Sequence, residues 1–572
     1  MAKQTFDVCI VGSGAGGGVA AYVLAKAGAR VLVLEKGPWL TEKDFGDDEL
    51  RFGERNLIDQ DPLIEPRTFR DRPEEGPHQF VGKVLPVSRC VGGGSVHYGA
   101  VCFRFRPEDF RARSTWGALP GADVVDWPIT YQELLPAYRE VEKLIGVSGG
   151  GMREEPGPGS PDPDAEWRTD PYPMPGHPPN YGAKLFEDAA RTLGFHPFPT
   201  PVAINNGPYD GRPGCSYCGF CSSHGCPINA KGDTRVTALA KAVATGRCEI
   251  RPDAYAFRVE TAGGKAKRVL YVDGQGITRS AEASVFVLAC STVDTPRLVL
   301  LSDMPRDLVN HDVVGRFLQI HHFPGGVGFF DERIDYYRGF WSMRCLDDFY
   351  LGLPGGPPAF GFGNLQTIGP SSGYPLLAGG LISTAKTAGW GRSHKPFMRS
   401  VFGHFQFLGM IGQDPPVRSN VVDLDPIVND VYGFPVARIT YLHHPNDLVV
   451  QAAMMPFIEA IFLAMGAVSS QPVLPFAIPT GIPQVGKTDA HRRGVGRQFP
   501  NPIGGAVNHQ LGTMRMGMDP DASVVDADGR FHGIPNLYVA DGSIFPTSGG
   551  YNPTLTIQAL AWRIAEGIAA AV

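Results

Sequence analysis

The first 35 residues carry the feature that most constrains this chain, a glycine-rich turn between a β-prone run and an alanine-rich helical stretch. Residues 7–10 lead directly into the turn, residues 19–27 form the helical stretch, and a second apolar run, 29–34, ends at Glu35. Strand, glycine turn, helix, strand and acidic residue, in this order, make up the βαβ unit that binds dinucleotides. The sequence therefore predicts an α/β fold that opens with a Rossmann-like domain.

Each residue of this unit has an expected task. Gly12 permits the tight turn, Gly14 lets the backbone approach a pyrophosphate, and Gly17 lets the helix pack closely on the strand. The helix N-terminus offers free N–H groups and the positive end of its dipole to the anion. Glu35 suits a ribose hydroxyl rather than a 2′-phosphate. A purely structural turn is the alternative, and the motif alone does not separate FAD from NAD.

Composition and charge narrow the possible partners. The chain has 572 residues, of which 43% are hydrophobic and 19% charged, which is typical of a soluble protein with several domains and a large core. Its formal net charge is -6, and it has no Lys/Arg cluster long enough to neutralise a run of phosphates. We therefore expect no nucleic-acid partner.

Membrane insertion is not expected either. The most apolar stretch, 452–468, contains Pro456 and Glu459 and is interpreted as a core helix. The N-terminal residues enter a strand at once, which leaves no room for a secretory signal. We therefore expect a cytoplasmic protein, or a periplasmic one if a partner that carries a signal exports it.

Motifs near the C-terminus indicate that the dinucleotide is FAD rather than NAD. They occupy residues 508–517, 536–543 and 552–554, and a long helical stretch follows the last of them. Together with the N-terminal βαβ unit and the segments 92–99 and 285–302, they resemble the glucose–methanol–choline (GMC) oxidoreductase family, which binds FAD. The segment with the cysteines further resembles flavoprotein subunits of bacterial sugar, gluconate and fructose dehydrogenases, and the family also includes pyranose-oxidase-like enzymes. Only residues 320–500 lack family-wide motifs.

The resemblance implies a discontinuous FAD-binding domain and an α+β architecture overall. Its first part is expected at 1–145, its second at 236–319, and its C-terminal part, with active-site residues, at 501–572. A Gly/Pro-rich excursion with the cysteines is expected at 146–235. A substrate-binding domain on a mixed or antiparallel sheet is expected at 320–500. Within this plan we expect a helix at 127–147 and strands at 254–259 and 285–289.

The resemblance also implies flavin contacts. They include the residues of the βαβ unit named above and, further along the chain, Gly93, Gly94, Ser95, His97, Asp541, Gly542, Asn552, Pro553 and Thr554. Pro553 suits the first turn of a helix, since its missing N–H would have no partner there. Residues 554–571 have an apolar face at helical spacing, and the start of this helix would stabilise negative charge on a reduced flavin. An ordinary terminal helix is the alternative.

Alcohol oxidation requires a base for the hydroxyl proton and an acceptor for the hydride. A neutral imidazole is a suitable base, since its ordinary pKa is about 6.5. Among fifteen histidines, His509 matches the family's catalytic histidine, and Asn552 matches the second position of the pair. Asn552 cannot exchange a proton usefully, so we expect it to orient the substrate hydroxyl. The rate should then rise with pH through the imidazole titration.

His97 is a second candidate for flavin chemistry. In sugar-oxidising relatives, a histidine at this place in the glycine-rich loop is bonded to the flavin 8α carbon, which raises the flavin potential. A histidine beside a non-covalent flavin is the alternative, and both remain open.

Four cysteines, Cys215, Cys218, Cys221 and Cys226, crowd into twelve residues and are followed by a proline. Such spacing is typical of an iron–sulfur cluster, here 3Fe–4S or 4Fe–4S, which would pass single electrons to a small subunit or a cytochrome. Zinc fits the spacing less well, and disulfides are disfavoured in the cytosol. Both remain alternatives.

These observations predict an FAD-dependent dehydrogenase that oxidises a CH–OH group of a sugar, glycoside or polyol by hydride transfer to flavin N5. An oxygen-using oxidase of the same fold, with structural cysteines, is the first alternative. A lyase or an inactive flavoprotein subunit on this fold is the second. The sequence does not specify the substrate.

Overall fold

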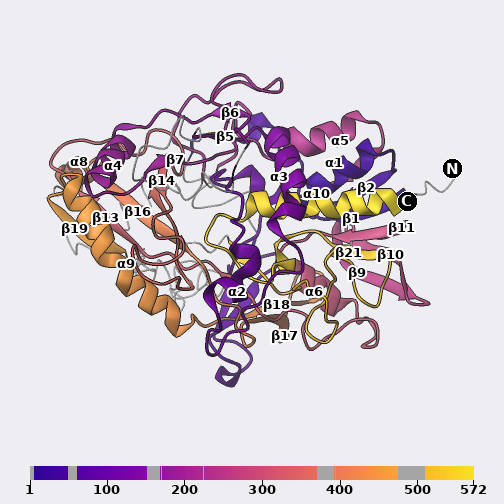
Figure 1. Ribbon diagram of the computed structural model, residues 1–572. Helices are drawn as coiled ribbons and strands as arrows, with labels where there is room; N and C mark the ends of the chain where they lie inside the picture. The colour runs from indigo at the N-terminus through magenta and orange to yellow at the C-terminus, as the bar shows by residue number, and fades with distance from the viewer. Residues whose placement is uncertain are drawn as a thin grey trace.

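The computed structural model describes residues 6–48, 61–150, 168, 170–222, 224–369, 392, 394–473 and 509–571. Two large sheets dominate it (Figure 1). The seven-stranded sheet lies in the right half of Figure 1 beside α10 (Thr554–Ala571), and the six-stranded sheet lies at the left beside α9 (Pro445–Ala464). The mixed helix and sheet content and the Rossmann-like unit confirm the predicted fold class.

The seven-stranded sheet is built around the predicted βαβ unit. That unit consists of β1 (Phe6–Val11), α1 (Ala15–Lys26) and β2 (Val31–Leu34), and its two strands pair in parallel. The sheet order is β8-β2-β1-β11-β10-β9, with β21 also paired to β11. The bounds of the other strands are β8 Cys248–Arg251, β9 Tyr255–Ala262, β10 Lys265–Val272, β11 Thr278–Leu288 and β21 Leu537–Val539.

Strand β11 is longer than the expected 285–289 because its two halves have different surroundings. The C-terminal half is buried and pairs in parallel with β1 and β21. The N-terminal half is mostly exposed and pairs antiparallel with β10. Because the residues of this half are mostly polar, the apolar pattern that predicted the buried half did not extend to them.

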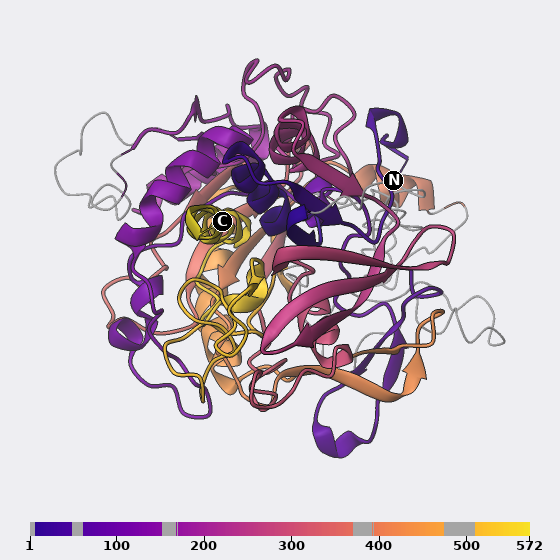
Figure 2. The same cartoon turned by 90° about the vertical axis from the view of Figure 1, so that its right-hand side faces the viewer.

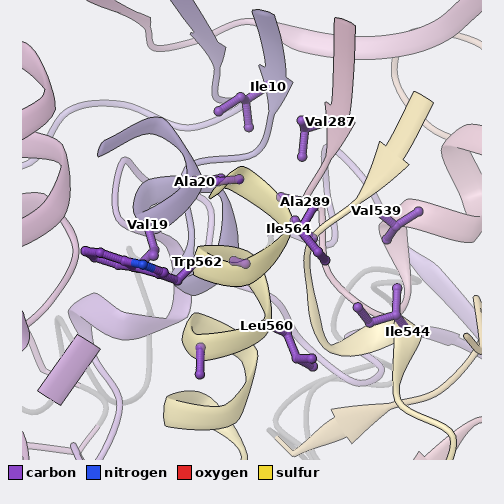
Figure 3. Close-up of a cluster of buried hydrophobic side chains, with 14 of the residues drawn as sticks. Ile10, Val19, Ala20, Val287, Ala289, Val539, Ile544, Leu560, Trp562 and Ile564 are labelled. Atoms are coloured by element: carbon purple, nitrogen blue, oxygen red, sulfur yellow. The ribbon is translucent and has the colours of Figure 1, made fainter. Parts of the chain in front are cut away.

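The C-terminal helix α10 forms the centre of the largest core. It packs against α1 and against α3 (Tyr131–Ile145), and Figure 2 shows it end-on beside α1. Figure 3 shows Ile564 of α10 beside Ala289 on the side of Val539 of β21, and Leu560 on the side of Ile544, all within this core. Its range agrees with the expected helix. This packing holds α10, which starts at Thr554, against the βαβ unit of the seven-stranded sheet.

Helix α3 is shorter than the expected 127–147 because both of its ends are capped. Thr130 and Glu133 form a reciprocal capping box at the N-terminus. Gly146 ends the helix in the left-handed conformation.

The six-stranded sheet is antiparallel in every pairing that the described residues show. Its order is β19 (Ser469–Val473), β13 (Gly325–Phe329), β16 (Phe405–Gly412), β15 (Gly363–Ile368), β14 (Arg344–Leu346) and β7 (Phe198–Pro199). Helix α9 packs against β13 and β19, and also against α4 (Tyr181–Thr192). A second hydrophobic cluster fills the space between these elements.

Smaller sheets connect the two halves. A four-stranded sheet has the order β17 (Val421–Asn429), β18 (Pro435–Thr440), β3 (Arg67–Arg70) and β4 (Phe80–Gly82). It therefore joins strands from 1–145 with strands from 320–500, and the predicted domain boundaries stay predictions. β12 (Gln319–Ile320) pairs antiparallel with β20 (Gln510–Leu511). The shorter helices are α2 (Ala112–Trp116), α5 (Ala240–Ala244), α6 (Asp294–Leu301) and α8 (His394–Val401).

The Gly/Pro-rich segment 146–235 is more regular than a surface loop. Its described part contains α4, the strand β7, and the short parallel pair β5 (Ser148–Gly149) and β6 (Met174–Pro175). Sequence reasoning missed α4 because it stands between proline-rich flanks, although Asn180 caps it by accepting a hydrogen bond from the N–H of Ala183. Residues 151–167 and 169 lie outside the described residues.

Helix α9 covers most of the apolar stretch expected to be a core helix, but it begins earlier, at Pro445, and ends earlier, at Ala464. Among the described residues it alone has the length and apolar composition to cross a membrane, and 39% of that window is buried. One side packs on the sheet, while Leu448, Val449 and Leu463 on the other side are exposed. The segment is therefore buried along one side only, and the expectation that it does not enter a membrane stays a prediction.

Candidate active site

A cavity of about 460 Å³ brings together most of the residues singled out in the sequence. Its lining comes from the β1–α1 turn, the glycine-rich loop, the segment after β11, the start of β20 and the start of α10. The predicted residues on its wall are Gly12, Gly14, Glu35, Gly93, Gly94, Ser95, His97, His509, Asp541, Gly542, Asn552 and Thr554. Gly17 and Pro553 lie outside the lining, and Gly17 packs directly against it. A Cβ on Gly17 would lie 2.0 Å from the Gly12 carbonyl oxygen.

Two glycine-rich segments meet at the start of α1. Gly12 has a φ of +96°, and a Cβ there would lie 2.3 Å from the carbonyl oxygen of Ala289. A Cβ on Gly93 would lie 2.7 Å from the Cα of Gly14, so the two backbones touch. No side chain caps the N-terminus of α1, which leaves its first N–H groups for an anion. This arrangement fits a pyrophosphate.

The carboxylate of Glu35 is fixed at the end of β2. One oxygen accepts hydrogen bonds from the backbone N–H and the hydroxyl of Ser13, at 3.1 and 2.7 Å, and the other accepts from the N–H of Gly37 at 3.0 Å. Burial raises the pKa of Glu35 above its ordinary value, although these donors oppose the rise. The carboxylate lies on the cavity wall, as the ribose contact requires.

A network of buried ion pairs, which sequence reasoning missed, supports this end of the cavity. Lys36 contacts Asp294 at 2.7 Å and Glu65 at 3.0 Å, and Arg67 contacts Asp294 at 2.7 Å. Burial alone would raise the pKa of Asp294, but Arg67 and Lys36 hold it below its ordinary value. Arg297 pairs with Glu65 at 3.1 Å. No local sequence motif predicts these ion pairs, because the paired residues come from distant segments of the chain.

Asp541 connects two segments of the cavity wall. One oxygen accepts hydrogen bonds from the Ser291 N–H at 2.9 Å and the Thr295 hydroxyl at 2.6 Å, and the other accepts from the N–H and hydroxyl of Ser543. Ser291 has a φ of +96°, and its buried hydroxyl has no hydrogen-bond partner among the described residues. A polar group on the cavity wall that lacks a partner fits a site that holds a polar cofactor.

His97 lies on the cavity wall, where its Nε2 is hydrogen-bonded to the hydroxyl of Ser88. This contact gives the ring a fixed orientation in the glycine-rich loop. The contact does not test the covalent bond between His97 and the flavin, which stays a prediction.

The predicted catalytic pair is in contact. The Asn552 amide nitrogen lies 3.3 Å from His509 Nε2, and both side chains line the cavity. His509 is half-buried and lines the cavity. Desolvation lowers the pKa of His509 well below its ordinary value, with a smaller contribution from His321. The rise of rate expected from the imidazole titration stays a prediction, and this shift places it at more acidic pH than for an ordinary imidazole.

Two further side chains contact the pair and were missed in the sequence. His321 Nδ1 lies 3.0 Å from His509 Nδ1, and the Gln366 amide nitrogen lies 2.8 Å from Asn552 Oδ1. Both belong to the region 320–500, which contains no readable motif. His321 directly follows β12, whose Ile320 pairs with Gln510, the residue next to His509, and no signal in the sequence predicts this register.

The four cysteines lie in a loop that reaches the cavity through Ser222. Burial raises the pKa of Cys215 to about 11 and also raises that of Cys221, so both remain thiols at neutral pH. In the part of the chain that the structure describes, no group of three or more His, Cys, Asp or Glu side chains could hold a metal ion. The arrangement of the described cysteines therefore gives no support to the predicted iron–sulfur cluster, which stays a prediction.

Comparison with known proteins places these features in a family. Two family models described as GMC oxidoreductase match residues 176–323 and 416–561. A third, described as an NAD(P)-binding Rossmann-like domain, matches residues 10–52.

Individual relatives match over nearly the whole length. The chain is 32% identical to 2-methyl-1,2-propanediol dehydrogenase of Mycolicibacterium austroafricanum, with 99% of this chain and 95% of the relative covered. It is 30% identical to the fructose dehydrogenase large subunit of Gluconobacter japonicus, with 99% of both covered. The fold is similar to that of formate oxidase from Aspergillus oryzae RIB40, in a variant with a mutation that affects FAD modification. The TM-score is 0.65 at 16% sequence identity, and the match covers 99% of this chain and 98% of that one.

Proposed function

This chain belongs to the GMC oxidoreductase family and is an FAD-dependent oxidoreductase, and from this premise we propose that it oxidises a CH–OH group of a sugar, glycoside or polyol. The observation that carries the proposal is the contact between His509 and Asn552 on the wall of the cavity that fits FAD. When bound there, FAD supplies the hydride acceptor, its N5 atom.

The geometry of the pair suits one hydroxyl group. The 3.3 Å between Asn552 Nδ2 and His509 Nε2 is longer than a typical N–H hydrogen bond, so a substrate oxygen can lie against both atoms. In that position the hydroxyl donates to His509 Nε2, and its oxygen accepts from the Asn552 amide. His509 then takes the proton while the carbon–hydrogen bond breaks and the carbonyl forms. The substrate thus loses one proton to His509 and one hydride to the cofactor.

Burial sets the protonation state of the base before this step. Because the pKa of His509 lies well below its ordinary value, the ring is neutral at physiological pH and can accept a proton without first losing one. Packing of His321 and Gln366 behind the pair also excludes water from its far side.

The relatives support a polyhydroxylated substrate and a partner. Their printed names refer to a diol and to a sugar, and one of them is a large subunit. We extend both to this chain as a small-molecule alcohol or sugar and a small subunit or cytochrome that receives electrons. An iron–sulfur cluster at the four cysteines stays a prediction without support from their arrangement. Iron and sulfide assays on anaerobically purified protein would test it, and no step here depends on it.

Anaerobic mixing of the FAD-loaded enzyme with a panel of polyols, sugars, glycosides and simple alcohols tests the proposed function. We expect a subset of polyhydroxylated compounds to bleach the flavin absorbance, with one carbonyl product per flavin. Stopped-flow mixing with oxygen and with one-electron acceptors then separates oxidase from dehydrogenase. A flavin that no compound on the panel bleaches would contradict the proposal and favour a lyase or an inactive subunit.

A further inference from the structure

A row of hydrogen bonds continues beyond the catalytic pair in both directions. At one end, the Gln366 amide nitrogen lies 2.8 Å from Asn552 Oδ1. In the middle, Asn552 contacts His509 and His509 contacts His321 at 3.0 Å, Nδ1 to Nδ1. At the other end, His321 Nε2 lies 3.1 Å from the carbonyl oxygen of Ser548 and 3.0 Å from that of Gly549. The row draws on four segments that are far apart in the sequence.

The two carbonyl oxygens decide the direction of the whole row. A carbonyl oxygen only accepts, so His321 Nε2 must carry the hydrogen that both oxygens share. His321 is fully buried, and desolvation lowers its pKa to about 4, so the ring is neutral and its Nδ1 has no hydrogen. His509 Nδ1 must therefore be the donor in the contact between the two rings. A neutral His509 then has a bare Nε2 on the cavity side.

The remaining contacts follow from this assignment. The Asn552 amide must present its nitrogen to the bare Nε2 of His509, which turns its oxygen toward Gln366. Gln366 must then donate through its own nitrogen. Its oxygen is buried without a hydrogen-bond partner among the described residues, which agrees with an amide whose orientation is set by Asn552. Every hydrogen bond in the row thus points from Gln366 toward the carbonyl groups.

The carbonyl end is held rigidly. Ser548 accepts a hydrogen bond from the N–H of Asp414 at 2.8 Å, and the N–H of Gly550 donates to the hydroxyl of Tyr350 at 3.0 Å. The carbonyl of Gly550 also accepts from the N–H of Asn364 in β15, at 3.1 Å. The two acceptors of His321 therefore lie in a segment that cannot turn away without losing several hydrogen bonds.

We propose that His321 is a positioning residue that fixes His509 in the tautomer with a bare Nε2, ready to take the substrate proton. The proposal rests on the function proposed above. Because His321 is a neutral acceptor, it orients the ring without the charge that a carboxylate in this place would bring. When His509 becomes an imidazolium, its Nδ1–H hydrogen bond to His321 strengthens because the donor is now charged.

The nitrogen chemical shifts of the two rings test this directly. In protein labelled with ¹⁵N-histidine and loaded with FAD, without substrate, the ring signals of residues 321 and 509 are assigned by their loss in His321→Asn and His509→Ala. We expect a protonated Nε2 with a bare Nδ1 for His321, and the opposite pattern for His509. The same tautomer on both rings, or a bare Nε2 on His321, would overturn the proposal.

Two substitutions of similar size separate positioning from packing. His321→Leu removes the acceptor, while His321→Asn keeps an oxygen that can accept from His509 Nδ1. We expect the Leu variant to lose about 10- to 100-fold in the limiting rate of anaerobic flavin reduction, part of what a general base contributes. The apparent substrate dissociation constant should change little, and the Asn variant should recover most of the rate. Equal losses in both variants would indicate a packing role and contradict the proposal.

The proposed function and the proposed role of His321 can each fail without the other. If the wild-type enzyme shows the expected tautomers but no alcohol reduces its flavin, the proposed function is wrong and the positioning of His509 stands. If alcohols reduce the flavin but the shifts place the hydrogen on His509 Nε2, the function stands and the role of His321 is wrong.

Discussion

The two ends of the cavity hold their side chains by different means. Around Glu35 the support consists of charges, with Lys36, Arg67 and Arg297 paired to buried carboxylates. Around His509 it consists of neutral imidazole and amide groups joined by hydrogen bonds. The charged end has opposite charges that balance one another, so it can remain ionised while buried. The neutral end has none in its row of hydrogen bonds.

This difference fits the tasks of the two ends. Recognition of a dinucleotide requires fixed groups that keep their protonation throughout turnover. Proton transfer requires a base that changes its charge, and a neighbouring carboxylate would raise its pKa and keep it protonated. The two ends should therefore respond differently to the loss or gain of a charge.

The largest effect should come from removing the base at the neutral end. His509→Ala is expected to slow anaerobic flavin reduction by about 10²–10⁴-fold, because general-base catalysis typically contributes that much. The amount of FAD bound per chain should stay the same, since the charged end is untouched. Stopped-flow absorbance and the flavin-to-protein ratio measure both quantities. An unchanged reduction rate in this variant would remove His509 from the mechanism.

At the charged end, loss of one carboxylate should affect stability rather than chemistry. Asp294→Asn leaves Lys36 and Arg67 without their common partner, and breaking a buried pair costs about 3–5 kcal/mol. Urea unfolding should show this loss, along with a lower FAD content. Asp273→Asn, which breaks an exposed pair with Arg279, is the control and should cost far less stability, because solvent screens exposed ion pairs. Similar losses in the two variants would contradict the importance of the buried network.

A charge placed in the neutral end should slow the reaction more modestly. In Gln366→Glu the new carboxyl can donate to Asn552 only while protonated, so the Asn552 amide loses its fixed orientation as the pH rises. We expect about a tenfold loss of the reduction rate at high pH, because a factor of this size corresponds to the free energy of about one hydrogen bond. The FAD should be retained. Gln366→Met removes the donor without adding a charge and should give a loss that does not depend on pH. If the Glu variant behaves like the Met variant at all pH values, the direction assigned to the row is wrong.

The predicted bond between His97 and the flavin is tested without turnover. If it exists, acid precipitation of the wild-type protein leaves yellow colour in the pellet, and His97→Ala releases its FAD into the supernatant. Loss of the bond should also slow turnover, since the flavin potential falls. Complete release from the wild-type protein would disprove the bond and leave the other predictions unaffected.

The sequence predicted what local signals encode. Gly12, Gly14 and Glu35 belong to one continuous unit, and the unit folds as expected because strand, turn and helix follow each other directly. The apolar face of α10 likewise predicted its range and burial. Family membership and the FAD-dependent oxidoreductase class are confirmed by the matches of the family models and relatives.

The neutral end could not be predicted in the same way. His321 meets His509 through the register of β12 with β20, which joins residues 188 positions apart. Gln366 reaches Asn552 from the middle of β15, where nothing in the sequence distinguishes it from other buried residues. The ion pairs of Asp294 escaped prediction for the same reason, because long-range packing determines them, whereas α4 was missed because of its proline-rich flanks. The roles of all these residues stay proposals.

The pH dependence of flavin reduction tests the central claim that a neutral, half-buried His509 accepts the substrate proton. The measurement is the limiting rate of anaerobic reduction by a saturating substrate between about pH 5 and 8, with protein stability checked at each pH. Burial lowers the pKa of His509 well below 6.5, and His321, which faces it, is neutral because its own pKa is about 4. We therefore predict a rate that stays level through pH 6.5 and falls only at more acidic pH. A rate that rises with an inflection near 6.5 or above would contradict the account.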